Sequence, residues 1–394
     1  MSDSKGTSRM LYEIAPRNVL SFDRHFAPIR LNNLNVLIGP NGSGKSNLIE
    51  LLTLLRAMPK DVRDVLRPGG GVGEWVWKGN PEGDAIIDVV IHNPYGKQSL
   101  RHSFSFRKEN QSFQLTDERI ENEKPYPGSA EPYFYYHFQD GNPVINVNDE
   151  RRYLAKDTVQ LNLSILAQRR DPEAYPEISY LASEYEKMAI YREWAFGRNA
   201  VFRGAQQADM RNDRLEEDFS NLGLFLNRLR RYPQTKRVIL DRLHDLYSSF
   251  TDFDISIEAG TVQVFFTERD FNIPATRLSD GTLRYLCLLA ILCDPEPPPL
   301  ICIEEPELGL HPDILPKLAD LLIDASKRTQ LIVTTHSDVI VDALTEQPEA
   351  VLICENIHGS TSMQRLDKKK LAHWLKDYRL GQLWVRGELG GTRW

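Results

Sequence analysis

The sequence predicts an α/β fold organised around a glycine-rich loop between a strand and a helix. Three observations support this. An apolar run at Leu34–Ile38 precedes the loop, residues 85–138 alternate polar and apolar side chains, and the chain after residue 251 alternates helical patterns with short apolar runs. Alternating segments separated by turns form antiparallel meanders, and short apolar runs between helices form buried parallel strands. We therefore expect an antiparallel β lobe and a parallel-sheet core.

The glycine-rich loop matches the phosphate-binding pattern G-x-x-x-x-G-K-[ST]. Its glycines allow backbone N–H groups to turn inward, and the following helix, expected from Lys45 to about Ala57, directs its positive end into the same space. In this pattern Lys45 contacts the β- and γ-phosphates and Ser46 binds Mg²⁺. The alternative is a glycine-rich turn that binds no ligand. The strand before the loop and the helix after it favour the phosphate-binding loop over this alternative. The predicted nucleotide-binding residues are Gly39, Pro40, Asn41, Gly42, Ser43, Gly44, Lys45, Ser46 and Asn47.

Composition favours a folded protein of one large or two closely packed domains. The chain has 394 residues, of which 41% are hydrophobic and 26% are charged, and its net charge is −7. This charge argues against general nucleic-acid coating, although a local basic groove remains compatible with it. Its four cysteines show no C-x-x-C spacing, which predicts reduced thiols and a cytoplasmic protein. The longest apolar run, Leu286–Cys293, is too short for a bilayer, so we expect no membrane segment.

The N-terminal part of the chain reads mainly as strands. Strands are expected at residues 11–14 and 19–22, followed by a strand region from 29 to 38 that leads into the loop. After the helix, glycines mark a loop and an antiparallel meander follows. Its predicted strands are Ala85–His92, Leu100–Arg107, Phe113–Ile120 and Tyr133–Phe138.

The middle of the chain changes to helical periodicity at Pro176–Arg192 and again at Asp213–Phe250. Basic residues accumulate between and along these segments, and two interpretations stay open. They bind DNA phosphates, or they lie on a solvated helical face beside Glu216, Glu217 and Asp218. The basic residues are Arg198, Arg203, Arg211, Arg214, Arg228, Arg230, Arg231, Lys236 and Arg237.

Two carboxylates follow the apolar run Leu300–Ile303, and a histidine follows the run Gln330–Thr334. The carboxyl ends of parallel strands are where open α/β sheets bind their ligands. We assign Glu304 to the Mg²⁺ shell and Glu305 to orienting and deprotonating the attacking water. His336 is placed to bond the γ-phosphate. The alternatives are that His336 is structural, as a lone histidine more often is, and that Glu304 and Glu305 lie in a solvated turn.

A second anion site is predicted at Ser279, Asp280 and Gly281, where a helix begins. A serine and a glycine at a helix start leave N–H groups free, and the helix dipole favours a phosphate there. One chain would then carry two phosphate-facing elements.

These motifs, in this order, resemble the ABC-type ATPase heads of the SMC, RecF and OLD group of AAA ATPases. The resemblance includes Glu307–Pro312 and covers nearly the whole chain. It implies a bilobed head over residues 1–394, with the Walker A motif (the P-loop) and β meander in 1–170. A helical insertion would occupy 171–250, and the signature motif, Walker B motif and His switch would lie in 251–394. It also implies that Gln168 senses Mg²⁺ and water, and that ATP is sandwiched between the P-loop of one protomer and Ser279 and Gly281 of another, giving a homodimer.

The sequence departs from transporter signatures at Asp280 and Thr282, and from the usual aspartate at Glu304. The resemblance therefore implies an ATPase acting on DNA, in repair or anti-phage defence. Only 58 residues follow His336, without a set of spaced carboxylates, so any nuclease would be a separate effector protein. The alternative function is a nucleotide-gated scaffold with little hydrolysis. A transporter's nucleotide-binding subunit fits these sequence features less well than either. The tail, Leu383–Trp394, either packs on the head as an amphipathic segment or shares the ending of stand-alone predicted ATPases.

Overall fold

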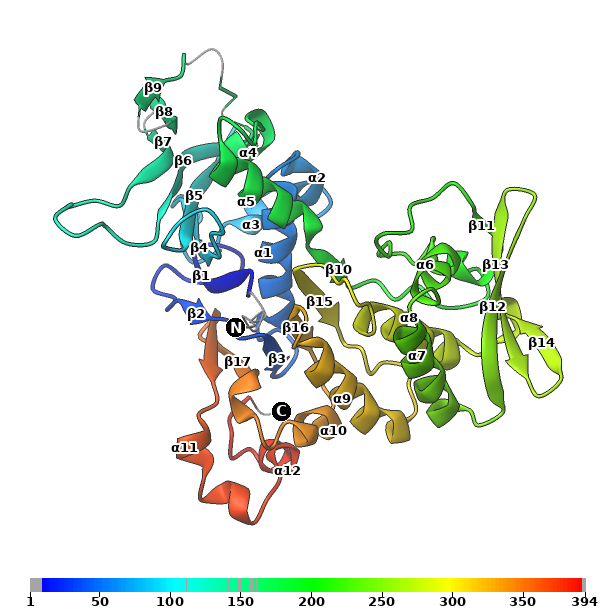
Figure 1. Cartoon of the computed structure of the whole chain (residues 1–394). Helices are drawn as coiled ribbons and strands as arrows, with labels where there is room; N and C mark the ends of the chain where they lie inside the picture. Colours follow the sequence, from blue (N-terminus) through cyan, green and yellow to red (C-terminus); the bar gives the residue numbers. More distant parts are fainter. Residues whose placement is uncertain are drawn as a thin grey trace, which may run out of the picture. The chain divides into compact units, whose positions relative to one another are not determined.

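The computed structural model describes residues 9–391, except 111, 140, 141, 148, 149, 156–158 and 161. The chain forms two compact units, which are described separately here (Figure 1). The first unit comprises Met1–Met188, Glu349–Asp367 and Gly387–Trp394. The second unit comprises Ala189–Pro348 and Lys368–Arg386. The last three residues of the predicted tail, Thr392, Arg393 and Trp394, lie outside the described residues.

An antiparallel sheet dominates the first unit and confirms the predicted meander. Successive strands are hydrogen-bonded neighbours from β4 onward, as expected for strands joined by short turns. Phe104, Phe106 and Ile120 are buried on this sheet, whereas alternate residues are more exposed. In spatial order the strands are β2 (Ile29–Arg30), β1 (Leu11–Arg17), β4 (Ala85–Ile91), β5 (Leu100–Glu109), β6 (Ser112–Asn122), β7 (Phe134–Gln139), β8 (Asn142–Val147) and β9 (Glu150–Tyr153).

The first unit also contains the strand, loop and helix of the P-loop. Strand β3 (Leu34–Ile38) pairs in parallel with β17 (Val351–Ile357), which pairs antiparallel with β18 (Ser360–Arg365). Helix α1 (Lys45–Ala57) follows the loop and has the predicted bounds. Its leucines at helical spacing are buried, and α5 lies beside it (Figure 1). The other helices of this unit are α2 (Arg63–Leu66), α3 (Val72–Trp75), α4 (Ile165–Gln168) and α5 (Pro176–Lys187).

A parallel sheet in the second unit confirms the predicted parallel core. Strand β15 (Leu300–Glu304) lies between β10 (Ala189–Tyr191) and β16 (Gln330–Thr334), and both pairings are parallel. The register pairs Glu304 with Thr334, so both strands end at the same edge. Residues on both faces of β15 and β16 are buried, as in sheets covered by helices. The nearby helices are α8 (Asp280–Leu292), α9 (Leu315–Ala325) and α10 (Asp338–Ala343).

The second unit contains a further, antiparallel sheet with two helices. Its strands are β11 (Gln206–Gln207), β13 (Thr261–Glu268), β12 (Phe250–Glu258) and β14 (Phe271–Pro274). Helices α6 (Leu222–Leu229) and α7 (Pro233–Leu246) contact β12. Two short helices near the C-terminus, α11 (Lys368–Leu371) and α12 (Leu380–Val385), complete the unit, and α12 packs on α10.

Several element boundaries differ from the sequence predictions. The strand expected at 19–22 is a tight turn, in which Leu20 has a φ of 52° and Val19 pairs with Phe22. The helical stretch expected at Asp213–Phe250 is two helices, because Phe219 adopts a φ of 61° before α6 and Pro233 starts a new helix as α7. Residues 189–191, expected as a helix end, form β10.

The described cysteines are buried and free, which agrees with the prediction of reduced thiols. Burial raises the pKa of Cys293 and of Cys354 to about 12, so both thiols stay protonated at neutral pH. Across the described residues, none of the helices combines the length and the apolar character needed to span a bilayer.

Candidate functional site

The P-loop adopts a backbone that glycine makes possible. Gly39 and Gly44 have φ values of 147° and 94°, which residues with a Cβ rarely adopt. A Cβ at Gly39 would lie 2.1 Å from the Cys354 carbonyl oxygen, and one at Gly44 would lie 2.0 Å from Thr361 Oγ1. The loop therefore requires glycine both for its dihedral angles and for its close approach to β17 and β18.

Lys45 is buried and its amino group is held by the loop itself. Nζ donates to the carbonyl oxygens of Gly39, at 2.8 Å, and of Pro40, at 2.9 Å. These contacts keep the cation at the first turn of α1, beside the loop that the pattern assigns to the phosphates. Its predicted role would require Nζ to exchange these carbonyl oxygens for phosphate oxygens.

The start of α1 fits an anion. Its N-cap, Gly44, has no side chain and so makes no side-chain cap, and the first turn contains no acidic residue. Ser43 Oγ is buried and has no hydrogen-bond partner among the described residues. Uncapped N–H groups at a helix start together with a buried unpaired hydroxyl are what a phosphate would satisfy. The loop is therefore a suitable cradle for a polyphosphate.

Side chains distant in sequence brace the P-loop from outside. Thr361 Oγ1 donates to the Ser43 carbonyl oxygen at 3.1 Å and lies 2.6 Å from Ser21 Oγ. Asn47 Nδ2, from α1, donates to the same Ser21 hydroxyl at 2.6 Å. Asn356 Nδ2 donates to the Gly42 carbonyl oxygen at 3.3 Å. The sequence analysis named Asn47 but missed Thr361, Ser21 and Asn356.

Gln168 ends α4 in the first unit, and its amide is used locally. Oε1 accepts from the backbone N–H of Gln160 at 2.8 Å, and Nε2 donates to the carbonyl oxygens of Gln160, Leu163 and Ser164. Both ends of the amide therefore stabilise the loop before α4. A role in sensing Mg²⁺ would require these bonds to be exchanged.

Glu304 and Glu305 lie at the carboxyl end of β15 in the second unit, as predicted. Glu304 Oε2 forms an ion pair with Arg192 Nε at 2.9 Å, and its carbonyl oxygen accepts from Trp194 Nε1 at 2.7 Å. The segment after β10 therefore holds Glu304.

Glu305 has a left-handed backbone conformation and faces His336. Its φ is 46°, and its N–H donates to the carbonyl oxygen of Thr334 at 3.1 Å. His336 Nε2 lies 3.5 Å from Glu305 Oε1. Both side chains are about one third exposed, so they can reach a ligand or water. The structure thus brings together two residues that the sequence analysis selected separately.

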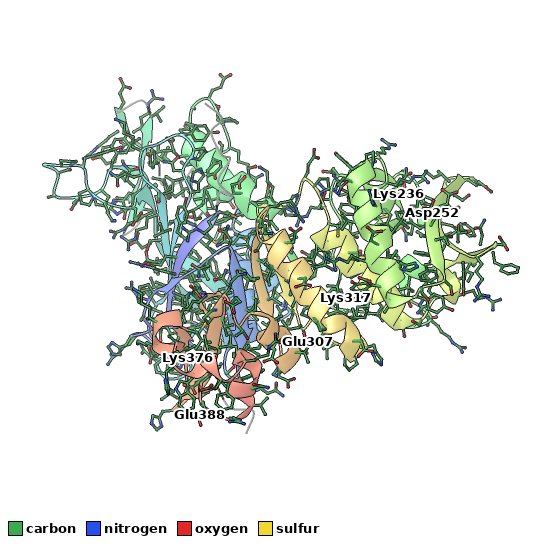
Figure 2. All side chains as sticks on the ribbon, turned by 60° about the horizontal axis from the view of Figure 1, so that its bottom comes forward. Lys236, Asp252, Glu307, Lys317, Lys376 and Glu388 are labelled. Atoms are coloured by element: carbon green, nitrogen blue, oxygen red, sulfur yellow. The ribbon has the colours of Figure 1, made fainter. Side chains whose placement is uncertain are left out.

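Glu307 holds the backbone of the His336 segment through hydrogen bonds. Its Oε1 accepts from Thr335 Oγ1 at 2.8 Å and from the N–H of His336 at 2.7 Å. Burial raises the pKa of the Glu307 carboxyl, although these hydrogen bonds oppose the shift. Oε2 is buried without a hydrogen-bond partner among the described residues. Glu307 is labelled in Figure 2.

The predicted signature residues begin α8. Ser279 is the N-cap, and its Oγ accepts from the Thr282 N–H at 3.2 Å. Asp280 forms an ion pair with Arg203 and accepts from the Gly197 N–H at 3.1 Å. A Cβ on Gly281 would lie 3.0 Å from the Gly309 carbonyl oxygen. Gly281 therefore allows the loop after Glu305 to approach the start of α8.

A buried arginine on α8 also contacts that loop. The guanidinium of Arg284 lies 4.6 Å from the Trp194 ring centroid and 5.1 Å from that of Phe196. Its Nη2 lies 3.5 Å from the Glu305 carbonyl oxygen. Burial lowers the pKa of Arg284 to about 10, which still leaves it charged at neutral pH. Arg284 thus joins the signature helix to the backbone of Glu305.

Most of the basic residues that suggested DNA binding are paired with carboxylates in the second unit. The pairs are Arg203 with Asp280, Arg211 with Asp213, Arg228 with Asp294, Arg230 with Asp254, and Lys236 with Asp252. Lys236 and Asp252 are labelled in Figure 2. Residues that already have ion-pair partners favour the interpretation of a charge-balanced surface.

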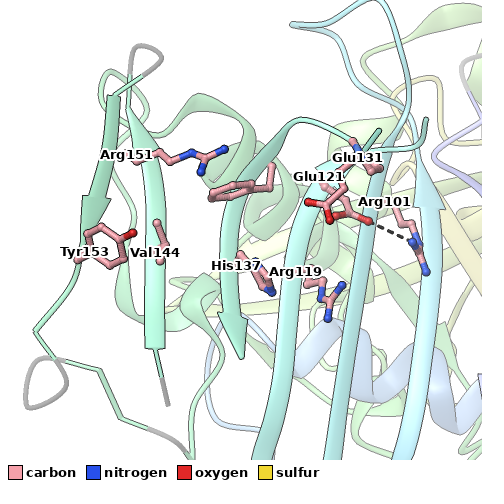
Figure 3. Close-up of a pocket in the computed structure, with 10 residues that line it drawn as sticks. Arg101, Arg119, Glu121, Glu131, His137, Val144, Arg151 and Tyr153 are labelled. Atoms are coloured by element: carbon pink, nitrogen blue, oxygen red, sulfur yellow. Dashed lines mark hydrogen bonds and ion pairs between the residues drawn. The ribbon is translucent and has the colours of Figure 1, made fainter. Parts of the chain in front are cut away.

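A separate cavity of about 420 Å³ lies on the antiparallel sheet of the first unit (Figure 3). Its lining includes three arginines, but Arg101 pairs with Asp88 and Glu121, and Arg119 pairs with Asp117. Arg151 lies over the Phe134 ring at 5.3 Å. The mixed charge of this cavity does not select one class of ligand.

Metal binding by protein groups alone is not indicated. The part of the chain that the structure describes contains no cluster of three His, Cys, Asp or Glu side chains suited to a metal ion. Mg²⁺ in nucleotide sites is typically held by phosphate oxygens and waters with only one or two protein ligands. Ser46 in the first unit and Glu304 in the second unit stay the predicted Mg²⁺ ligands.

A family model described as "AAA domain, putative AbiEii toxin, Type IV TA system" matches residues 34–342, which include every predicted site motif. The chain belongs to this AAA family. No curated protein matches its sequence.

Solved structures show that this AAA protein has the fold of SMC heads. The SmcHead bound to the C-winged helix domain of ScpA matches with a TM-score of 0.58 and 13% identity, covering 92% of this chain and 99% of that chain. An Smc head domain bound to the C-terminal domain of ScpA from Pyrococcus furiosus matches with a TM-score of 0.53 and 12% identity, covering 93% and 99%. These matches confirm the predicted fold class, an α/β ATPase-head fold.

Proposed function

We propose that this AAA protein binds and hydrolyses ATP with Mg²⁺. The observation that carries the proposal is the Glu305–His336 pair at the end of two parallel strands, in a chain whose P-loop fits a polyphosphate. Open α/β folds place their ligands at this edge, and phosphoryl transfer needs a positioned nucleophile and charge neutralisation. Both requirements have candidate residues here.

In the proposed mechanism each residue has one task. Lys45 leaves its loop carbonyls and neutralises the β- and γ-phosphates, while the N–H groups at the start of α1 bind phosphate oxygens. Glu305 orients the water and accepts its proton, and His336 bonds the γ-phosphate. Ser46 would be a ligand of Mg²⁺, and Glu304 is the predicted acidic ligand; the ion would supply further positive charge to the phosphates.

Two features favour slow turnover, and with it the second candidate, a nucleotide-gated scaffold. Glu304 is ion-paired to Arg192, and the amide of Gln168 is used by its own loop. Metal binding by either residue would first require breaking these contacts, which costs free energy. ATP would then act mainly as a switch between assemblies.

The proposal includes a homodimer that sandwiches ATP between the P-loop of one protomer and the signature of its partner. Ser279 and the uncharged Gly281 at the start of α8 favour a phosphate there. Complexes of the matched SMC heads with parts of ScpA support a further protein partner for this chain. We propose a separate effector, with DNA as the substrate, in cytoplasmic repair or anti-phage defence.

The decisive experiment measures binding of a fluorescent ATP analogue and release of phosphate by the wild type and by Lys45→Ala. Without the lysine, the phosphates meet only backbone dipoles, so affinity should fall at least tenfold. Lys60→Ala, which removes an exposed lysine just after α1, is the matched control. Binding by Lys45→Ala at wild-type affinity would contradict the P-loop assignment.

A further inference from the structure

We propose that the segment 368–379 of the second unit binds single-stranded nucleic acid through a lysine–tryptophan surface. This surface comprises Lys369, Lys370, Trp374, Lys376 and Arg379, all of which are exposed. It lies outside residues 34–342, the range that the family model matches. The proposal rests on the nucleic-acid part of the proposed function and names the surface that would carry it.

Charge is concentrated in this part of the chain. Residues 367–386 contain six lysines and arginines and two aspartates, giving a net charge of +4 in a chain whose overall charge is −7. Lys370 and Lys376 form no ion pair or hydrogen bond within the described residues, and Figure 2 labels Lys376. Exposed cations without acidic partners can release counterions when they bind phosphates, which drives nucleic-acid association.

An aromatic side chain lies between these cations in the sequence. Trp374 is 42% exposed, and its ring centroid lies 6.3 Å from that of His373 and 6.4 Å from that of Tyr378. Neither α11 nor the 3₁₀ turn Trp374–Lys376 has a buried residue, so folding alone does not require the indole there. An exposed ring beside lysines provides a stacking platform for unpaired bases, and duplex DNA offers no such base. This favours a single strand over a duplex.

The basic residues between 198 and 237 are less suited to binding nucleic-acid phosphates. Arg211, Arg230 and Lys236 have carboxylate partners and would have to exchange them for phosphates. The net gain from such an exchange is smaller than the gain from an unpaired lysine, because the carboxylates are left behind without a cation. The two regions thus provide a test and a matched control in one chain.

The lysine–tryptophan surface is fixed to an element that follows His336. Helix α12, directly after the surface, packs on α10: Leu380 N–H donates to Thr345 Oγ1 at 3.1 Å, and Gln382 N–H donates to Asp342 Oδ1 at 3.3 Å. Helix α10 is capped by Ser337, the residue after His336. A bound strand would therefore lie on the part of the second unit that is packed against the end of the His336 segment.

The test measures fluorescence anisotropy of a labelled 20-nucleotide oligo-dT and of a labelled 20-base-pair duplex with the full chain. We expect the wild type to bind the single strand more tightly than the duplex. Lys370→Gln/Lys376→Gln should weaken single-strand binding about tenfold or more and lower the slope of log affinity against log salt by about 1.4, or about 0.7 per phosphate contact. Trp374→Ala should weaken it about fivefold or more.

The control is Arg211→Gln/Arg230→Gln, which removes two paired cations and should bind within about twofold of the wild type. The proposal is overturned if the wild type does not bind the oligonucleotide at low salt, as expected for a surface that binds an acidic protein. It is also overturned if the lysine variant binds normally, or if the duplex is preferred. Phosphate release from ATP is measured on the same preparations, so a missing ATPase activity would count against the proposed function alone.

Discussion

Glu305 Oε1 lies 3.5 Å from His336 Nε2, although 31 positions separate the two residues in the sequence. The parallel register of β15 and β16, which pairs Glu304 with Thr334, places the residues after both strands at one edge. The left-handed conformation of Glu305 turns the chain directly after the strand. Glu305 and His336 are therefore neighbours, as the proposed roles of a base for water and a donor to phosphate would require.

The variant Glu305→Gln should bind ATP but hydrolyse it about 10²–10⁴ times more slowly, because the amide keeps the size of the side chain and removes the base. Phosphate release and ATP affinity are measured together. ATP that stays bound should also hold two protomers together, since binding free energy is then linked to association. Light scattering with and without ATP and Mg²⁺ would detect this dimer.

Two further variants serve as controls for that experiment. Glu82→Gln changes an exposed carboxylate of the first unit and should behave as the wild type. Ser279→Arg in the Glu305→Gln background should prevent ATP-driven association by blocking the start of α8. Normal hydrolysis by Glu305→Gln would contradict the base assignment, and association that survives Ser279→Arg would contradict the sandwich dimer.

Replacing Glu307 should affect catalysis more than binding. Glu307→Ala removes the acceptor for the His336 N–H and the Thr335 hydroxyl, so the histidine loses its fixed position relative to Glu305. We expect kcat to fall about tenfold or more while the Kd for ATP changes less than about twofold. Glu307→Gln keeps one acceptor oxygen and should recover part of kcat. Equal losses of kcat in both variants would indicate that Glu307 acts through its negative charge and not through its hydrogen bonds.

Stability should depend on pH through the same carboxyl. Its pKa is raised in the folded protein by burial, so below the ordinary value of about 4.5 the group is protonated in both states and costs nothing. As pH rises above that value, the folded state must ionise a buried group and loses stability. The unfolding free energy of Glu307→Gln should therefore rise relative to the wild type between pH 4.5 and 8, as measured by urea denaturation. Glu82→Gln should show no such trend.

Thr361→Val should destabilise the P-loop while leaving the volume of the side chain at position 361 nearly unchanged. The substitution removes the hydroxyl that contacts Ser43 O and Ser21 Oγ, at a cost of about 1–3 kcal/mol for the groups left unpaired. The melting temperature and the affinity for an ATP analogue should both fall. Thr361→Ser should restore both, and Thr276→Val, at an exposed threonine, should leave them unchanged. An unchanged affinity in Thr361→Val would contradict the bracing role.

The sequence predicted those site residues that directly follow a recognisable strand in the chain. The P-loop, the acidic end of β15 and the histidine after β16 each combine a strand with the residues that follow it, so periodicity and motif suffice. Thr361, Arg192 and Arg284 were missed because their partners lie more than 20 positions away and depend on tertiary packing.

The incorrect boundaries have a local cause. The apolar spacing across Asp213–Phe250 is helical, yet a left-handed residue and a proline divide the stretch, and β12 begins at its end. The sequence left two interpretations of the basic residues open, because charge alone does not separate them. The partners Asp252, Asp254 and Asp280 come from other elements and could not be paired from sequence.

The ion pair between Arg203 and Asp280 decides how the start of α8 would meet a triphosphate. A carboxylate in the first turn of a helix normally occupies the electrostatic role of an incoming anion and repels it. With Arg203 as its counter-ion, Asp280 would oppose a phosphate at the proposed site less than a lone carboxylate would, so the dipole of α8 could still attract it. Loss of the Arg203 guanidinium would leave the charge of Asp280 uncompensated, so the start of α8 would repel an anion instead of attracting it. Residue 203 nevertheless belongs to no recognised motif.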